Sequence, residues 1–148
     1  MSPSLTLRIS ISFAMQSLAY YLDKPGGSFT PTSEDAPEPG PGEVRLRIAK
    51  TSVCQSDVVI YKQGLPRIKR WPAIVLHEAC CYVEAVGRGV TQFLPGDLVG
   101  LGCDIPCGAD DCIYCGVDGT GDWTSCPKTQ ATGHEFPGLA RTHATLPA

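Results

Sequence analysis

The stretch Ala73-Ile-Val-Leu-His-Glu-Ala-Cys-Cys-Tyr-Val-Glu-Ala-Val-Gly87 places a polar segment between two apolar ones. Its apolar residues predict two short strands, at residues 74–76 and 82–86, on either side of the polar segment His-Glu-Ala-Cys-Cys. His77 and Glu78 therefore follow directly on a strand, where a rigid scaffold can position side chains that carry chemistry. The stretch predicts a β-rich fold with its functional residues on loops.

The rest of the chain continues this pattern of short elements. Its 16 glycines and 13 prolines among 148 residues disfavour long helices and favour strands joined by turns. Residues 23–42 are rich in proline and glycine, which predicts a loop. A short helix is expected from Ser56 or Asp57, either of which can cap it, through Gln63 to Gly64. Further strands are predicted at residues 5–13, 17–22, 44–48, 98–101 and 139–146.

Length and charge narrow the class of protein. A chain of 148 residues is expected to form one domain. The net charge of −3 argues against a nucleic-acid partner. No apolar run approaches the roughly 18 residues needed to span a membrane, and residues 1–22 alternate instead of forming the continuous core of a signal peptide. We expect a cytoplasmic protein with a small-molecule substrate.

The chain contains eight cysteines, and five of them lie between residues 103 and 126. Residues 102–138 show little apolar pattern, so this segment needs a metal or a partner to hold it. The spacing Cys107-x4-Cys112-x2-Cys115-x10-Cys126 suits one closed, tetrahedral, structural Zn²⁺ site. Cys103 could replace Cys107 as the first ligand. Disulfides or free buried cysteines are the alternatives, and the absence of a signal peptide favours zinc.

A second group of possible ligands comes from two separate segments. Cys54 lies in the loop before the predicted helix, and His77-Glu78 follows an apolar strand. A thiolate, an imidazole and a carboxylate can hold a catalytic zinc with an open coordination position. A lone cysteine or histidine is usually structural. These residues alone therefore do not decide between a catalytic zinc site and ordinary structural side chains.

Several collinear motifs extend this pattern along the chain. They are Pro39-Gly-Pro-Gly-Glu-Val-Arg-Leu-Arg-Ile48, Val53-Cys-Gln-Ser-Asp57, His77-Glu78 with Val83-Glu-Ala-Val-Gly87, Phe93-Leu-Pro-Gly-Asp97, the four-cysteine segment, and residues 137–148. Together they resemble the catalytic domain of zinc-dependent alcohol dehydrogenases of the medium-chain dehydrogenase/reductase superfamily. The resemblance covers about residues 15–148, so residues 1–14 are expected to be an N-terminal extension.

The resemblance implies a GroES-like, partly open β-barrel with short helices and a cysteine-rich zinc lobe at about residues 103–126. It implies that Cys54 and His77 bind the catalytic zinc. Glu78 would be a nearby carboxylate, and Ser56 would relay a proton to the oxygen of the substrate. The lobe ligands would be Cys107, Cys112, Cys115 and Cys126.

The chain also departs from the family pattern. Leu76 and Cys81 stand where the family has glycines around its His-Glu pair, and Val59 stands where it often has a relay histidine. The lobe spacings of four, two and ten differ from the usual two, two and seven. The family's third catalytic-zinc ligand lies beyond residue 148. Possible substitutes are Glu78, Cys80, Cys81, His134 and His143.

The sequence contains no strand, glycine-rich loop and helix in the order that binds a dinucleotide. We therefore expect no NAD(P) binding by this chain alone. The main hypothesis is non-redox zinc chemistry on a carbonyl or hydroxyl group, such as isomerisation, dehydration, cyclisation or aldol-type cleavage. The alternatives are an alcohol dehydrogenase fragment or subunit that needs a separate nucleotide-binding domain, and a non-catalytic, zinc-stabilised binding protein. The face that a nucleotide-binding domain would cover is a candidate surface for a homodimer.

Overall fold

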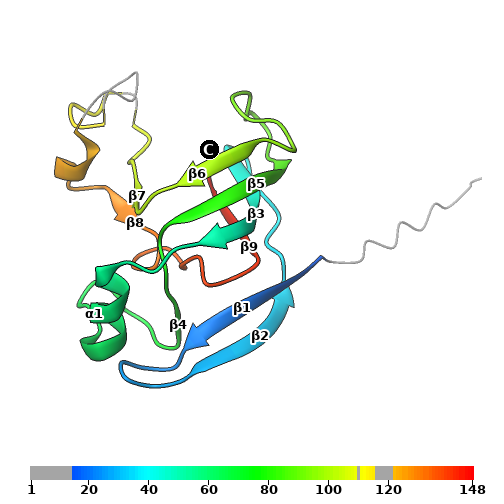
Figure 1. The fold of residues 1–148 in the computed structure, drawn as a ribbon. Coiled ribbons are helices and arrows are strands. Elements are labelled where there is room, and N and C mark those ends of the chain that lie inside the picture. Colours follow the sequence, from blue (N-terminus) through cyan, green and yellow to red (C-terminus); the bar gives the residue numbers. More distant parts are fainter. Residues whose placement is uncertain (1–14, 110, 116–121) are drawn as a thin grey trace, which may run out of the picture.

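The computed structural model describes residues 15–109, 111–115 and 122–148. The described residues are mainly strands with few helices, as predicted (Figure 1). The elements in chain order are β1 (Gln16–Leu22), β2 (Phe29–Asp35), β3 (Glu43–Thr51), α1 (Gln55–Gln63), β4 (Ala73–Ile74), β5 (Ala79–Val86), β6 (Leu98–Leu101), β7 (Asp104–Ile105), the 3₁₀ helix η1 (Trp123–Ser125), β8 (Gln130–Ala131) and β9 (His143–Pro147).

Two antiparallel sheets form the body of the molecule. One has the strand order β6-β5-β3-β9 and the other β2-β1-β4, while β7 and β8 form a separate two-stranded ladder. The segment before β9 joins the two sheets, because the N–H of Tyr20 donates to the carbonyl of Ala140 at 2.8 Å and that of Thr142 donates to Leu18 at 2.8 Å. The sheets therefore wrap into one continuous, partly open surface.

The apolar core consists of two clusters. The larger lies against the four-stranded sheet and contains Val44, Leu46, Cys81, Val83, Ile105, Leu139, Ala144 and Leu146. The smaller lies beneath α1 and contains Leu22, Ile60, Ile68 and Val75. Leu76 packs against both clusters, so the residue just before His77 lies where they meet.

The segment at residues 23–42 was wrongly predicted to be all loop. It contains β2, which pairs with β1 over seven residue pairs, from Gln16 opposite Asp35 to Leu22 opposite Phe29. The residues of β2 are exposed except for the half-buried Glu34, so no alternation of apolar residues marks the strand. It also contains Pro31, which an edge strand tolerates because one side of its backbone faces solvent.

Other predicted boundaries shift by a few residues. The strand expected at 82–86 begins at Ala79, so Cys80 and Cys81 belong to β5 and not to a loop. The strand expected at 74–76 is β4, which ends at Ile74, and the last strand is His143–Pro147. The short strands β7 and β8 lie in the segment expected to have no regular structure. The strand predicted at 5–13 lies outside the described residues.

The N-cap of helix α1 is Cys54, two residues before Ser56 and three before Asp57, the two caps predicted from the sequence. The Cys54 Sγ accepts from the backbone N–H of Ser56 at 3.4 Å, and Asp57 Oδ2 accepts from the N–H of Cys54 at 2.9 Å. This reciprocal capping box satisfies backbone donors that the first turn leaves free. Gly64 ends the helix with φ of 70°, as predicted. None of the helices in the described ranges has the length and apolar character needed to cross a bilayer.

Leu76 stands where the family pattern has glycine, and it adopts φ of 71°. It is the one non-glycine residue with positive φ among the residues described. Such a conformation costs an L-residue about 1–2 kcal/mol. Three backbone hydrogen bonds from residues 138–140 to residues 74–76 hold this segment in place, including one from Leu139 N–H to the Leu76 carbonyl at 2.9 Å. The two core clusters accommodate the bulk of the Leu76 side chain.

Candidate metal centres

The four predicted lobe cysteines come together in space. The ligand atoms of Cys107, Cys112, Cys115 and Cys126 all lie within 4.8 Å of one another. The Cys107 and Cys115 sulfurs are 3.5 Å apart, and those of Cys112 and Cys126 are 3.7 Å apart. A tetrahedral zinc with Zn–S bonds of about 2.3 Å needs sulfurs about 3.8 Å apart. The donor set and its spacing therefore fit a closed zinc site.

The backbone around Cys112 favours a thiolate. The N–H groups of Cys115 and Tyr114 lower the pKa of Cys112 to about 6. A metal ligand must be deprotonated, so this arrangement prepares Cys112 for zinc at neutral pH. Cys103 lies outside the four-cysteine group, so the geometry favours Cys107 as the first ligand, which stays a prediction.

Cys54, Ser56 and His77 form a second centre where α1 begins and β4 has ended. The Cys54 Sγ lies 2.9 Å from Ser56 Oγ and 3.1 Å from His77 Nε2, and Ser56 Oγ lies 3.4 Å from the same nitrogen. His77 is buried and Cys54 is half-buried. A thiol, a hydroxyl and an imidazole thus converge on one point from segments 21–23 residues apart.

Asp57 supports both candidate ligands, a role that the sequence analysis missed. It lies in the first turn of α1, where its Oδ2 accepts from Cys54 N–H and its Oδ1 lies 3.4 Å from His77 Nδ1. No hydrogen bond within the described residues satisfies either Asp57 Oδ1 or His77 Nδ1. The sequence signal was the Cys-x-x-Asp spacing, which places the carboxylate three residues after an N-cap.

Of the five possible substitutes for a third ligand, the structure brings Glu78 into the group. The ligand atoms of Cys54, His77 and Glu78 lie within 4.8 Å of one another, and Glu78 Oε1 is 3.9 Å from His77 Nε2. The Glu78 Oε2 accepts from Ser52 Oγ at 2.8 Å. These three donors are of the types that zinc binds.

The remaining candidates lie elsewhere. Cys81 is fully buried in the larger core cluster, and burial raises the pKa of its thiol to about 11. Cys80 is exposed and lies outside the group. His143 Nε2 lies 3.7 Å from Glu84. The ring of His134 is 6.4 Å from that of His77, centre to centre, so it is a neighbour of the site but not one of the three grouped donors.

The family model for the alcohol dehydrogenase GroES-like domain matches residues 40–148. The chain belongs to this family. Among curated relatives, L-threonine 3-dehydrogenase of Pyrococcus horikoshii is 34% identical over 128 residues, which cover 84% of this chain and 35% of the relative. Aldehyde reductase YahK of Escherichia coli is 33% identical over 114 residues, covering 70% of this chain and 31% of the relative.

Solved structures show the same GroES-like fold. An Escherichia coli oxidoreductase/dehydrogenase of unknown specificity matches 90% of this chain and 38% of its own with a TM-score of 0.75 and 29% identity. Galactitol-1-phosphate dehydrogenase of Escherichia coli matches 88% of this chain and 36% of its own with a TM-score of 0.75 and 26% identity. The chain spans about a third of the length of the curated relatives it matches.

The GroES-like domain places no glycine-rich loop before its helix. Among the described residues α1 is the sole α-helix, and residues 52–54, which lead into it from β3, are Ser-Val-Cys. The N-terminus of this helix carries Cys54, a candidate zinc ligand, and no glycine-rich segment of the kind that binds a pyrophosphate. The expectation that this chain alone does not bind NAD(P) stays a prediction.

Proposed function

We propose that this GroES-like domain is the zinc-binding catalytic part of an alcohol dehydrogenase or reductase, and that it acts on a small molecule together with a nucleotide-binding unit. The observation that carries the proposal is the convergence of Cys54, Ser56 and His77 within 2.9–3.4 Å of one another. Cys54 and His77 would hold the zinc, with Glu78 as the third donor.

Bound zinc would act as a Lewis acid on an alcohol or carbonyl oxygen. The chain's own residues would then prepare the substrate. Ser56 Oγ can relay the proton of a substrate hydroxyl: it accepts a hydrogen bond from that hydroxyl and passes its own proton on to water, because it stands beside both candidate ligands and is half-exposed at the centre. Asp57 keeps His77 oriented with Nε2 toward the centre, since it faces Nδ1 from the opposite side.

The hydride would go to a nicotinamide held by a unit other than this domain. The relatives described above are named dehydrogenases, reductases or oxidoreductases. They favour hydride transfer over the main hypothesis from the sequence, non-redox zinc chemistry, which finds no support among them. Cytoplasmic location and pairing of two copies stay predictions.

The test compares turnover with and without a nicotinamide. The zinc-loaded domain is combined with the nucleotide-binding part of a relative, and NAD(P)⁺ reduction is followed with a panel of primary and secondary alcohols. We expect turnover only in the combined protein, with a primary kinetic isotope effect from alcohol deuterated at the reacting carbon. Ser56→Ala should lower kcat by about 100-fold or more, whereas Ser33→Ala, on exposed β2, should not change it.

Two results would contradict the proposal. Conversion of an alcohol or carbonyl compound by the isolated domain without nicotinamide would favour the non-redox hypothesis. An active combined protein whose Ser56→Ala variant keeps full kcat would remove the hydroxyl from proton transfer. Zinc content and circular dichroism of each variant separate these outcomes from loss of metal or fold.

A further inference from the structure

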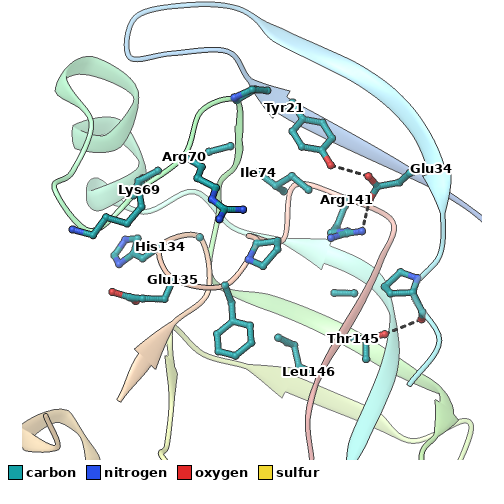
Figure 2. A pocket seen from close by; sticks show the side chains of 18 of the residues that line it. Tyr21, Glu34, Lys69, Arg70, Ile74, His134, Glu135, Arg141, Thr145 and Leu146 are labelled. Atoms are coloured by element: carbon teal, nitrogen blue, oxygen red, sulfur yellow. Dashed lines mark hydrogen bonds and ion pairs between the residues drawn. The ribbon is translucent and has the colours of Figure 1, made fainter. Parts of the chain in front are cut away.

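A cavity of about 790 Å³ opens between four segments that are distant in sequence: the β1–β2 hairpin, residues 67–74, residues 133–137 and β9 (Figure 2). Its size lies within the range of small-molecule sites. Ile74, Phe136 and Leu146 are among the apolar residues of its lining, which also includes acidic and basic side chains. An apolar wall with a few convergent charges is typical of a pocket that binds an organic ion.

The carboxylates around the cavity are already paired. Glu34 contacts the guanidinium of Arg141 and accepts from Tyr21 Oη at 2.7 Å. Glu135 forms two hydrogen bonds with Arg67, at 2.8 and 3.3 Å. The third carboxylate, Asp35, accepts from the amide of Gln16 at 2.7 Å. Each acid that lines the cavity therefore has a partner in place.

Two cationic side chains of the cavity have no carboxylate partner in the part of the chain that the structure describes. Lys69 and Arg70 line the cavity side by side in sequence, and no carboxylate of the described residues lies within 4 Å of either. Lys69 Nζ donates to the carbonyl of Pro66 at 2.8 Å, which leaves its charge uncompensated. Figure 2 shows the Arg70 guanidinium directed into the cavity, on the side of Arg141. Lys69 and Arg70 thus bring two positive charges without carboxylate partners in the described ranges to the lining of the cavity.

From this arrangement we infer that the cavity binds a small molecule with an apolar body and an anionic group, a carboxylate or a phosphate, held by Arg70 and Lys69. An anion there would form charge-assisted hydrogen bonds with both side chains, and a guanidinium can bind either group through two parallel bonds. The inference does not depend on the proposed redox function, because it uses none of the candidate zinc ligands.

The cavity adjoins the candidate metal centre through His134. This residue lines the cavity, and its ring lies 6.4 Å from the ring of His77. The anionic group could therefore belong to the substrate of the metal centre or to a separate ligand. Both kinds of ligand would bind Arg70 through the same anionic group. They are distinguished by whether zinc changes the affinity of the chain for the ligand.

The experiment measures binding of hexanoate and of its neutral analogue hexanamide to the 148-residue chain by calorimetry, with inorganic phosphate as a second anion. We expect hexanoate to bind at least about tenfold more tightly than hexanamide, and its Kd to rise with ionic strength. Arg70→Gln and Lys69→Gln should each weaken hexanoate binding by about tenfold. Arg88→Gln is the matched control, because Arg88 is exposed and does not line the cavity.

Equal affinity for the acid and the amide, absence of binding by both, or hexanoate binding that is unchanged in Arg70→Gln and Lys69→Gln would each overturn the inference. Circular dichroism of the variants shows that the fold is intact. Repeating the titration with 6-hydroxyhexanoate, with and without zinc, identifies the source. A zinc-dependent gain over hexanoate assigns the site to the substrate, and equal affinities assign it to a separate ligand.

Discussion

The Nδ1 atom of His77 lies 3.4 Å from the Oδ1 atom of Asp57, and both side chains are only 5% exposed. The second oxygen of the same carboxylate accepts from the N–H of Cys54 at 2.9 Å. One acid in the first turn of α1 thus contacts two residues that lie 23 positions apart. A carboxylate that accepts a hydrogen bond from a ligating histidine sets its tautomer and raises its basicity. The 3.4 Å approach places Asp57 for that role, although the two atoms form no hydrogen bond in this structure.

Replacing this acid should weaken metal binding without removing a ligand. Asp57→Asn is expected to lower the zinc affinity of the Cys54–His77 centre by about 10–100-fold, as measured by competition with a chromophoric chelator. Asp35→Asn removes a carboxylate from the exposed strand β2 and should leave this affinity unchanged. Equal affinities in Asp57→Asn and the parent chain would show that Asp57 serves only the helix cap.

The two centres predict two zinc ions per chain. Cys115→Ser should lose the lobe zinc and retain the other, because three thiolates hold a structural zinc far less well than four. Metal analysis after dialysis gives the count, and limited proteolysis should cut residues 107–126 first, since that zinc holds a segment with little core of its own. Cys80→Ser changes an exposed thiol outside both groups and should keep two zinc ions.

The cysteines should differ in their reactivity with pH. While the lobe keeps its fold, Cys112 is expected to be alkylated at a lower pH than an ordinary thiol, since backbone N–H groups lower its pKa. Cys81 should resist alkylation at pH 8, because burial raises its pKa to about 11 and shields the sulfur. Mass spectrometry of peptides after timed iodoacetamide treatment checks both. Rapid labelling of Cys81 in folded protein would contradict its placement in the core.

His134 should make the fold sensitive to mild acid. Burial lowers its pKa, followed by the positive charge of Arg67, so the folded state disfavours the protonated ring. The unfolded state takes up the proton first as the pH falls through about 6.5. The free energy of unfolding should therefore decrease between pH 7 and pH 5, and the decrease should be smaller in His134→Gln. Urea denaturation at both pH values measures this difference, and parallel curves for the two proteins would refute it.

Gly87 should tolerate no side chain. A Cβ atom there would lie 1.8 Å from the carbonyl oxygen of Gly40, a backbone atom that cannot rotate away. Gly87→Ala is expected to destabilise the fold by about 2 kcal/mol or more, as measured by thermal or urea unfolding. Gly100→Ala is the matched control in the same sheet, because nothing lies within 4 Å of its added Cβ. Similar stability of the two variants would contradict the close approach.

The parts of the fold that were predictable from sequence are those with a local signal. The four lobe cysteines are close in sequence, so their spacing alone indicated one site. The residue types of Cys54 and His77 suggested a second metal site but did not decide it, because nothing local links residues 23 positions apart, and the resemblance to a family assigned them to one zinc. β2 was missed because its side chains are exposed and lack an apolar period. The cavity was missed because four distant segments form it, and no single one carries its pattern.

Leu76 has a consequence for how this domain can change by mutation. Its φ of 71° would suit glycine, yet its side chain packs against both core clusters. Replacement by glycine would remove the backbone strain of the positive φ, which stabilises the fold. It would also leave a void where the clusters meet, which destabilises the fold. Leu76→Gly alone therefore gains little stability. A net gain would require a larger side chain in one of the clusters to fill the void.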